Sequence, residues 1–141
     1  MLNAKEKSAL LKQAPLFAEC SDRELSKIAG VAKEVSRAAG KTIVHEGDPG
    51  SAFILIVDGT AKVSVHGRTA AQLGAGDYFG EIALLDKKPR TATVTAASDL
   101  HYLVLSAASF RIALKAYPTI GLRLLKELAG RVRSLERSLT G

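Results

Sequence analysis

The chain has 141 residues, of which 47% are hydrophobic and 24% charged, a composition typical of one soluble globular domain. It contains no run of about 18 apolar residues that could span a membrane, and its first residues lack the apolar core of a signal peptide. We therefore expect a cytoplasmic protein without a membrane partner. The net charge of +6 allows anionic ligands, but the basic residues are spread along the chain.

The first 39 residues are predicted to be helical. A capping-box pattern begins at Ser21 and ends at Glu24, where the two side chains satisfy free amides at the start of a helix. Apolar residues then recur at helical spacing as far as Val35. Pro15 separates this helix from a shorter one before it.

Residues 40–105 are predicted to form several short antiparallel strands. The dipeptide Asp58-Gly59 is suited to a two-residue hairpin turn between two apolar runs. Residues 91–96 alternate threonine with apolar residues, and residues 100–105 give one further strand. Short strands at this close spacing indicate an antiparallel barrel or jelly roll.

Residues 106–141 are predicted to form two helices that are separated at Pro118. In the second helix, apolar residues alternate at spacings of three and four, as Leu125, Leu128, Val132, Leu135 and Leu139. This seam fits packing against the chain's own barrel and fits equally well pairing with a second copy in a homodimer. The sequence leaves both alternatives open.

The polar residues best suited to binding a ligand lie between Phe79 and Val94. Gly80 permits close approach of a ligand to the backbone, and the residues after it can begin a helix whose free amides bind anions. Arg90 supplies a fixed charge and a planar set of donors suited to phosphate, and Thr91 can add a hydroxyl. The Glu81 carboxylate would repel a phosphate, but it can accept a hydrogen bond from a sugar hydroxyl. This combination predicts a nucleotide, and the alternative is an internal ion pair between Arg90 and Glu81.

The run FGEIALL, followed by a short spacer and PRTATV, resembles the phosphate-binding cassette of the cyclic-nucleotide-binding domains. That family includes the bacterial catabolite activator protein, regulatory subunits of cyclic-nucleotide-dependent kinases and nucleotide-gated channels. The resemblance extends over nearly the whole chain. It implies one domain, residues 1–141, which is mainly β with flanking helices: an eight-stranded antiparallel, jelly-roll-like β-roll with N-terminal helices and a C-terminal helix pair.

The resemblance also implies which residues grip the phosphate and the ribose. Glu81 would bind the ribose 2′-hydroxyl, and Arg90 would bind the cyclic phosphate. The backbone amides of Gly80, Ile82 and Ala83 would line the phosphate site.

Other positions would contact the remainder of the ligand. Val63 and Leu73 lie where relatives line the base pocket, and Arg131 lies where channel relatives place an arginine against the base. Thr91 would add a side-chain contact at the phosphate. In the family, a hydroxyl at the position of Thr91 permits guanine without demanding it. Bacterial relatives with a hydroxyl there usually take cyclic AMP, so the resemblance implies cyclic AMP as the ligand, with cyclic GMP as the alternative.

The implied function is a non-catalytic sensor whose last helix moves over the bound base and relays binding to a protein partner. No helix-turn-helix, channel or catalytic sequence is recognisable in the chain. It is expected to act either as a free-standing receptor or as a regulatory domain excised from a channel, kinase or transcription factor.

Two other classes of function fit the sequence less well. A cupin-type enzyme needs a cluster of metal ligands, whereas His45, His66 and His101 lie on separate predicted strands, so neither a metal nor another cofactor is expected. Direct nucleic-acid binding could use the basic residues of the last helix, which are Arg123, Lys126, Arg131, Arg133 and Arg137. Such binding would be phosphate-driven and salt-dependent, so specific recognition of DNA is not expected.

Overall fold

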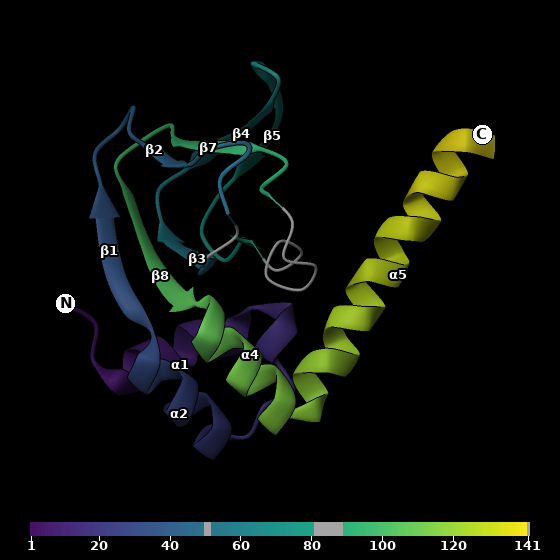
Figure 1. Cartoon of the computed structure of the whole chain (residues 1–141). Helices are drawn as coiled ribbons and strands as arrows, with labels where there is room; N and C mark the ends of the chain where they lie inside the picture. The colour runs from purple at the N-terminus through teal and green to yellow at the C-terminus, as the bar shows by residue number, and fades with distance from the viewer. Residues whose placement is uncertain (50–51, 81–88, 141) are drawn as a thin grey trace.

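A β-roll of two sheets stands on a base of helices in the computed structural model, which describes residues 1–49, 52–80 and 89–140 (Figure 1). The helices are α1 (Ala4–Gln13), the 3₁₀ helix η1 (Pro15–Phe17), α2 (Asp22–Val31), α4 (Ala107–Ala116) and α5 (Pro118–Thr140). The strands are β1 (Lys33–Arg37), β2 (Thr42–Val44), β3 (Ala52–Asp58), β4 (Ala61–Val65), β5 (Arg68–Leu73), β6 (Tyr78–Phe79), β7 (Thr93–Ala96) and β8 (Leu100–Ser106).

The eight strands of the described residues pair antiparallel in two four-stranded sheets. One sheet has the order β1-β8-β3-β6, and the other has the order β2-β7-β4-β5. This arrangement confirms the predicted β-roll with flanking helices. Among the described helices, none is long and apolar enough to cross a membrane.

Both N-terminal helices begin at a capping box. The predicted one is confirmed: the Glu24 amide donates to Ser21 Oγ at 3.2 Å, and the Ser21 amide donates to Glu24 Oε1 at 2.9 Å. A second, which the sequence analysis did not identify, joins Asn3 and Glu6 at the start of α1. Each box satisfies amides that have no partner inside the helix.

The prediction of helix through the first 39 residues is wrong at its end. Helix α2 ends at Val31, and Lys33–Arg37 forms strand β1 at the edge of the first sheet. Val35 lies opposite Tyr102 of β8 and packs against the core between the sheets. Pairing with β8 gives the backbone amides and carbonyls of this segment hydrogen-bond partners. The spacing of apolar residues along the sequence does not reveal this long-range pairing.

An aromatic cluster joins the roll to its helical base. Phe53 of β3 stacks on Phe110 of α4 at 5.2 Å between ring centroids, and it meets Phe17 of η1 edge-on at 5.6 Å. Tyr78 of β6 lies 5.4 Å from the same ring. Phe17, Phe53 and Phe110 are each at most 1% exposed. Aromatic pairs of this kind add about 0.5–1.5 kcal/mol beyond the burial of their area.

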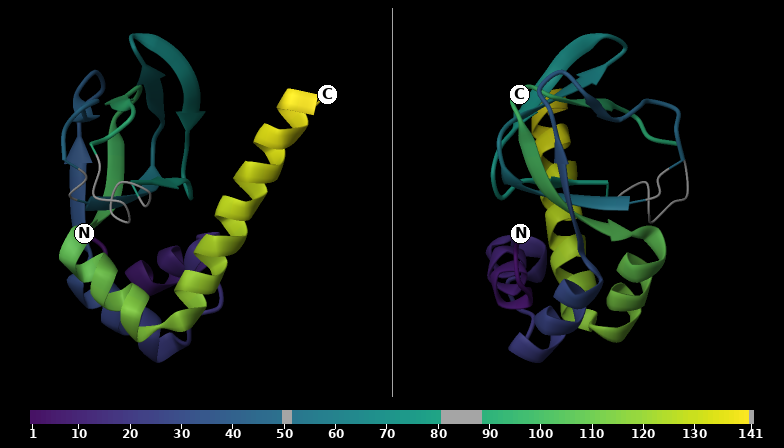
Figure 2. Two further views of the ribbon diagram at one scale, coloured as in Figure 1. Left: turned by 45° about the vertical axis from the view of Figure 1, so that its right-hand side comes forward. Right: turned by 90° about the vertical axis from the view of Figure 1, so that its left-hand side faces the viewer.

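Helix α5 departs from this compact body. Ile120 and Leu124 near its start are 0% and 4% exposed, whereas Leu125 and Leu135 are 64% and 65% exposed. The two views in Figure 2 show the helix leaving the base and running upward at an angle to the roll. The roll therefore sits beside a helix that is anchored mainly at its first turns.

The N-terminal segment is tied to the roll through Glu34 of β1. Its Oε1 accepts a hydrogen bond from the Leu2 amide at 2.7 Å, and its Oε2 lies 2.6 Å from His101 Nε2 on β8. The Leu2 amide is the main cause that lowers the pKa of Glu34 below its ordinary value of 4.5, and the contact with His101 adds to it. The folded state therefore favours the ionised carboxylate.

This tether predicts a pH dependence of stability. Because the folded-state pKa of Glu34 is lowered, its contribution is complete above the unfolded-state value and is lost as pH falls through the folded-state value. Glu34→Gln cannot titrate, so its free energy of unfolding should fall less steeply than that of the parent between about pH 5 and pH 3. Urea unfolding at a series of pH values measures the two slopes. If the free energy of unfolding fell equally steeply with pH in both proteins, the stabilising role given to the Glu34 carboxylate would be wrong.

Candidate functional site

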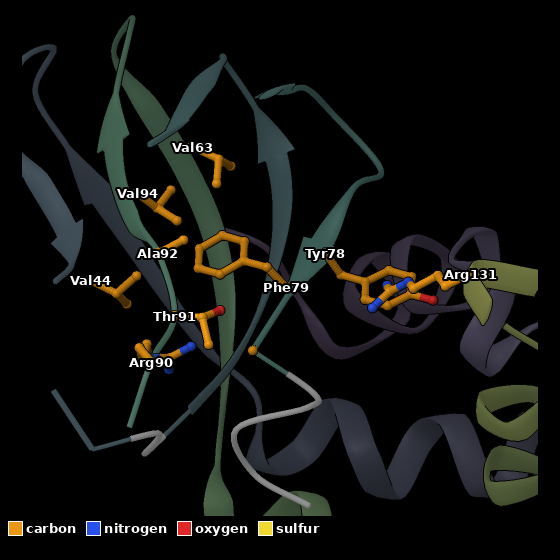
Figure 3. Close-up of a pocket in the computed structure, with 10 residues that line it drawn as sticks. Val44, Val63, Tyr78, Phe79, Arg90, Thr91, Ala92, Val94 and Arg131 are labelled. Atoms are coloured by element: carbon orange, nitrogen blue, oxygen red, sulfur yellow. The ribbon is translucent and has the colours of Figure 1, made fainter. Parts of the chain in front are cut away.

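One pocket opens between the β-roll and helix α5 (Figure 3). Its described lining consists of Val44, Val63, Tyr78, Phe79, Gly80, Arg90, Thr91, Ala92, Val94 and Arg131. Five positions predicted from the sequence meet here: Val63, Gly80, Arg90, Thr91 and Arg131. The pocket thus combines one polar end, at Arg90 and Thr91, with a wall of apolar side chains.

Arg90 is the buried cation of this site. It is 8% exposed and is the one charged residue that is buried among those the structure describes. Its Nη2 donates to the carbonyl of Ala52 at 2.8 Å. Its backbone amide donates to the carbonyl of Asp48 at 2.8 Å, and its own carbonyl accepts from the Gly47 amide at 2.9 Å. A buried charge needs polar partners, and the bond to Ala52 supplies one for the guanidinium, whereas the two backbone bonds hold the chain at Arg90.

The close approach of Ala52 and Arg90 requires glycine at position 80. Its φ is +101°, in the left-handed region that favours glycine. A Cβ built there would lie 2.5 Å from the carbonyl oxygen of Ala52 and 3.0 Å from Nη1 of Arg90. Gly80 therefore permits the close approach of the chain to β3 and to Arg90, in addition to the approach of a ligand that the sequence predicted.

The apolar wall comes from strands of the second sheet. Val94 of β7 lies opposite Val44 of β2 on one side and opposite Val63 of β4 on the other, so the three side chains form a row. Phe79 of β6 belongs to the other sheet, and Figure 3 shows its ring directed into the space near Val63 and Ala92. This row suits the flat apolar surface of an aromatic base.

The α5 side of the pocket is formed by Tyr78 and Arg131. The Tyr78 hydroxyl donates to the Glu127 carboxylate, one helical turn before Arg131. Burial raises the pKa of Glu127 above its ordinary value, and the charge of Arg131 opposes this rise. Arg131 itself is exposed to solvent at the pocket mouth.

The remaining predicted site residues are not among the described residues that line the pocket. Glu81, Ile82 and Ala83 lie outside the described residues. Leu73 ends β5, pairs with Ala61 and packs half-buried against the core between the sheets, rather than among the lining residues described. Its role at the base stays a prediction.

Five further residues line the pocket although the sequence does not predict them there: Val44, Tyr78, Phe79, Ala92 and Val94. Alternation along the predicted strand from residue 91 to residue 96 could have identified Ala92 and Val94, since alternate residues share one face of a strand. Val44 and Tyr78 needed the strand pairing and the position of α5, which the sequence does not contain.

A family model of the cyclic nucleotide-binding domain matches residues 34–117. The chain belongs to this family. It is 39% identical over 105 residues to the cAMP-dependent protein kinase regulatory subunit of Aspergillus niger, an alignment that covers 73% of this chain and 26% of that protein. The corresponding subunit of Eremothecium gossypii is 41% identical over 102 residues, covering 72% of this chain and 22% of the relative. The chain thus spans about a quarter of these relatives.

Solved structures agree with this membership. The catabolite activator protein of Thermus thermophilus superposes with a TM-score of 0.82 at 30% identity, over 90% of this chain and 62% of that one. The regulatory domain of Toxoplasma gondii protein kinase A, crystallised with cAMP, gives a TM-score of 0.79 at 26% identity, over 90% of this chain and 50% of that one. These relatives are regulators and binding domains, which confirms the prediction of a non-catalytic domain. No group of three or more potential metal ligands occurs among the residues described.

The geometry at Gly80 predicts that even a methyl group is not tolerated there. Gly80→Ala should lower the free energy of unfolding by about 1–2 kcal/mol, because its φ is unfavourable for an L-residue and its Cβ would meet Ala52 and Arg90. Gly30→Ala is the matched control, since Gly30 lies in α2 with open space around it. This control should raise the free energy of unfolding by up to about 1 kcal/mol. Urea denaturation measures the free energy of unfolding of both variants. A Gly80→Ala variant as stable as the parent would refute the requirement for glycine at this position.

Proposed function

We propose that this chain is a sensor domain that binds a cyclic mononucleotide, with cyclic AMP as the expected ligand and cyclic GMP as the alternative. The observation that carries the proposal is the buried, backbone-held guanidinium of Arg90 at the polar end of a pocket whose opposite wall is apolar. The relatives named as cAMP-dependent kinase subunits, and the Toxoplasma domain crystallised with cAMP, support the choice of adenine.

The phosphate is the group that the polar end suits best. Arg90 presents a planar, permanently charged donor set, and its burial strengthens the attraction because little water competes there. Thr91 adds a hydroxyl beside it. Glu81, from the sequence pattern, would accept a hydrogen bond from the ribose 2′-hydroxyl. The valine row would then receive the base.

The output is proposed to pass through α5 to a protein partner. The helix is buried at Ile120 and Leu124, but its later turns are exposed, and Arg131 on those turns lines the pocket. A ligand that contacts Arg131 in one position of the helix favours that position over others, by the difference in its affinity for the two. A partner that recognises α5 would detect the change.

A second proposal concerns the seam on α5. Four of its five residues are exposed: Leu125, Val132, Leu135 and Leu139 are 64%, 52%, 65% and 88% exposed. Leu128 alone of the five packs half-buried against the chain's own core. This distribution favours pairing of α5 with a second copy over packing on the roll.

The ligand proposal is tested by titration calorimetry of the full chain with cyclic AMP and cyclic GMP. We expect binding of at least one of them, and we expect Arg90→Ala to weaken it at least about 100-fold, because charge-assisted hydrogen bonds to the phosphate are lost. Because Arg90→Ala empties a buried position, Arg90→Lys is tested as well. It keeps the charge but not the planar fork, so we expect an intermediate loss.

Arg37→Ala is the control for these arginine variants, since Arg37 is exposed on β1 away from the pocket, and it should bind as the parent does. Binding of neither nucleotide would refute the proposal. Parent-like affinity in Arg90→Ala would show that the phosphate site lies elsewhere.

The dimer is tested by sedimentation equilibrium. We expect the parent to associate with increasing concentration and Leu135→Lys to remain monomeric, because a charge at the centre of an apolar seam would have to be buried. Leu122→Lys is the matched control, since Leu122 is 58% exposed on the same helix but outside the seam. A parent that stays monomeric at all concentrations would contradict the seam as an interface.

A further inference from the structure

The direction of α5 is set within a short stretch of the helix. Leu124 is 4% exposed and Leu128 is half-buried against the core, and from residue 129 to residue 139 every residue is exposed. Between the two leucines stands Glu127, whose carboxylate accepts the hydrogen bond of the Tyr78 hydroxyl. This contact joins the outer part of α5 to the β-roll.

Tyr78 is held rigidly on its own side of the contact. Its backbone belongs to β6, where it pairs with Leu55 of β3. Its ring lies 5.4 Å from that of Phe53, which in turn stacks on Phe110. The hydroxyl therefore occupies a position fixed by the core, and α5 is the element that can move relative to it.

Glu127 links this fixed point to the pocket. It lies four residues before Arg131, so both side chains project from the same face of α5. Glu127 is half-buried, and this burial raises the pKa of its carboxyl, whereas the charge of Arg131 lowers it. Tyr78 and Arg131 both line the pocket, as Figure 3 shows.

We propose that Tyr78 and Glu127 are a positioning pair that fixes the direction of α5 and so holds Arg131 at the mouth of the pocket. The consequence for ligand affinity rests on the proposed nucleotide site, whereas the consequence for α5 does not. Loss of the hydroxyl frees the outer turns of the helix, and Arg131 then spends less time where a bound nucleotide would meet it. Neither Tyr78 nor Glu127 needs to touch the phosphate for this effect.

The position of α5 is measured first, without nucleotide. Spin labels at Lys62→Cys and Ser134→Cys, both exposed sites, report the distance between the roll and α5 in a Cys20→Ala background. We expect one narrow distance distribution in the labelled parent and a broadened or shifted one in Tyr78→Phe and in Glu127→Ala. Glu127→Gln keeps an acceptor for the hydroxyl and should retain most of the parent distribution.

Tyr117→Phe is the matched control, because it removes a hydroxyl from a half-buried tyrosine that caps α4 and is not among the described residues lining the pocket, and it should leave the distribution unchanged. A parent-like distribution in both Tyr78→Phe and Glu127→Ala would overturn the proposal. Glu136→Gln removes a carboxylate from α5 beyond the contact, and a change as large as that of Glu127→Ala would equally overturn it.

Affinity for cyclic AMP is measured second, by calorimetry. Tyr78→Phe should weaken binding about three- to tenfold, the size expected for one lost hydrogen bond. In an Arg131→Ala background the same change should have no further effect, because the pair acts through Arg131. An equal loss in both backgrounds would overturn this route and show that Tyr78 contacts the ligand directly.

The two measurements separate the proposals. Absence of nucleotide binding in the parent would refute the proposed function, and the distance measurement would still decide whether the pair directs α5. Binding that depends on Arg90 but shows no change of α5 in Tyr78→Phe and Glu127→Ala would refute the pair and leave the nucleotide site standing.

Discussion

The burial of the Arg90 guanidinium against the carbonyl of Ala52 is the constraint on which the site depends. A charge at this depth is tolerated only with polar partners, and the carbonyl of Ala52 in β3 accepts a hydrogen bond from the guanidinium. The backbone of Arg90 is held separately, by hydrogen bonds with the backbone of Gly47 and Asp48. The same crowding leaves no room for a Cβ at Gly80. The cation is thereby positioned by folding.

The aromatic cluster around Phe53 joins Tyr78, which lines the pocket, to the helical base. The ring of Phe53 contacts Phe17 of η1, Phe110 of α4 and Tyr78 of β6, so it joins the helical base to the roll beside the pocket. Helix α5 begins at this junction, with Ile120 fully buried. Its exposed outer turns contribute little packing, and elements with few buried apolar contacts are those that move most readily. The pocket therefore lies between a well-packed roll and a helix whose outer turns are exposed.

Much of the fold followed from local patterns. The capping box at Ser21 and the break before Pro118 act through neighbouring residues, so the chain specifies them without long-range information. The hairpin predicted at Asp58-Gly59 is wrong, because the flanking strands β3 and β4 lie in different sheets and pair with other strands. Strand β1 was mistaken for helix because its conformation is stabilised by pairing with β8, some 65 residues away in the chain. The arginine and glycine of the pocket were likewise found by motif, whereas Val44 and Tyr78 were not.

The sequence by itself therefore determined the class of the domain, because the run FGEIALL and the following PRTATV are close in the chain and resemble one family's cassette. The same segment predicts an anion site from the residue types of Gly80, Arg90 and Thr91. Only the tertiary structure decided how deeply Arg90 is buried, which apolar side chains face it and how α5 meets the roll. Those properties arise from contacts between segments far apart in sequence, as Arg90 with Ala52 and Tyr78 with Glu127 demonstrate. The sequence restricts which long-range contacts can form, and the packing of the folded chain determines which of them do form.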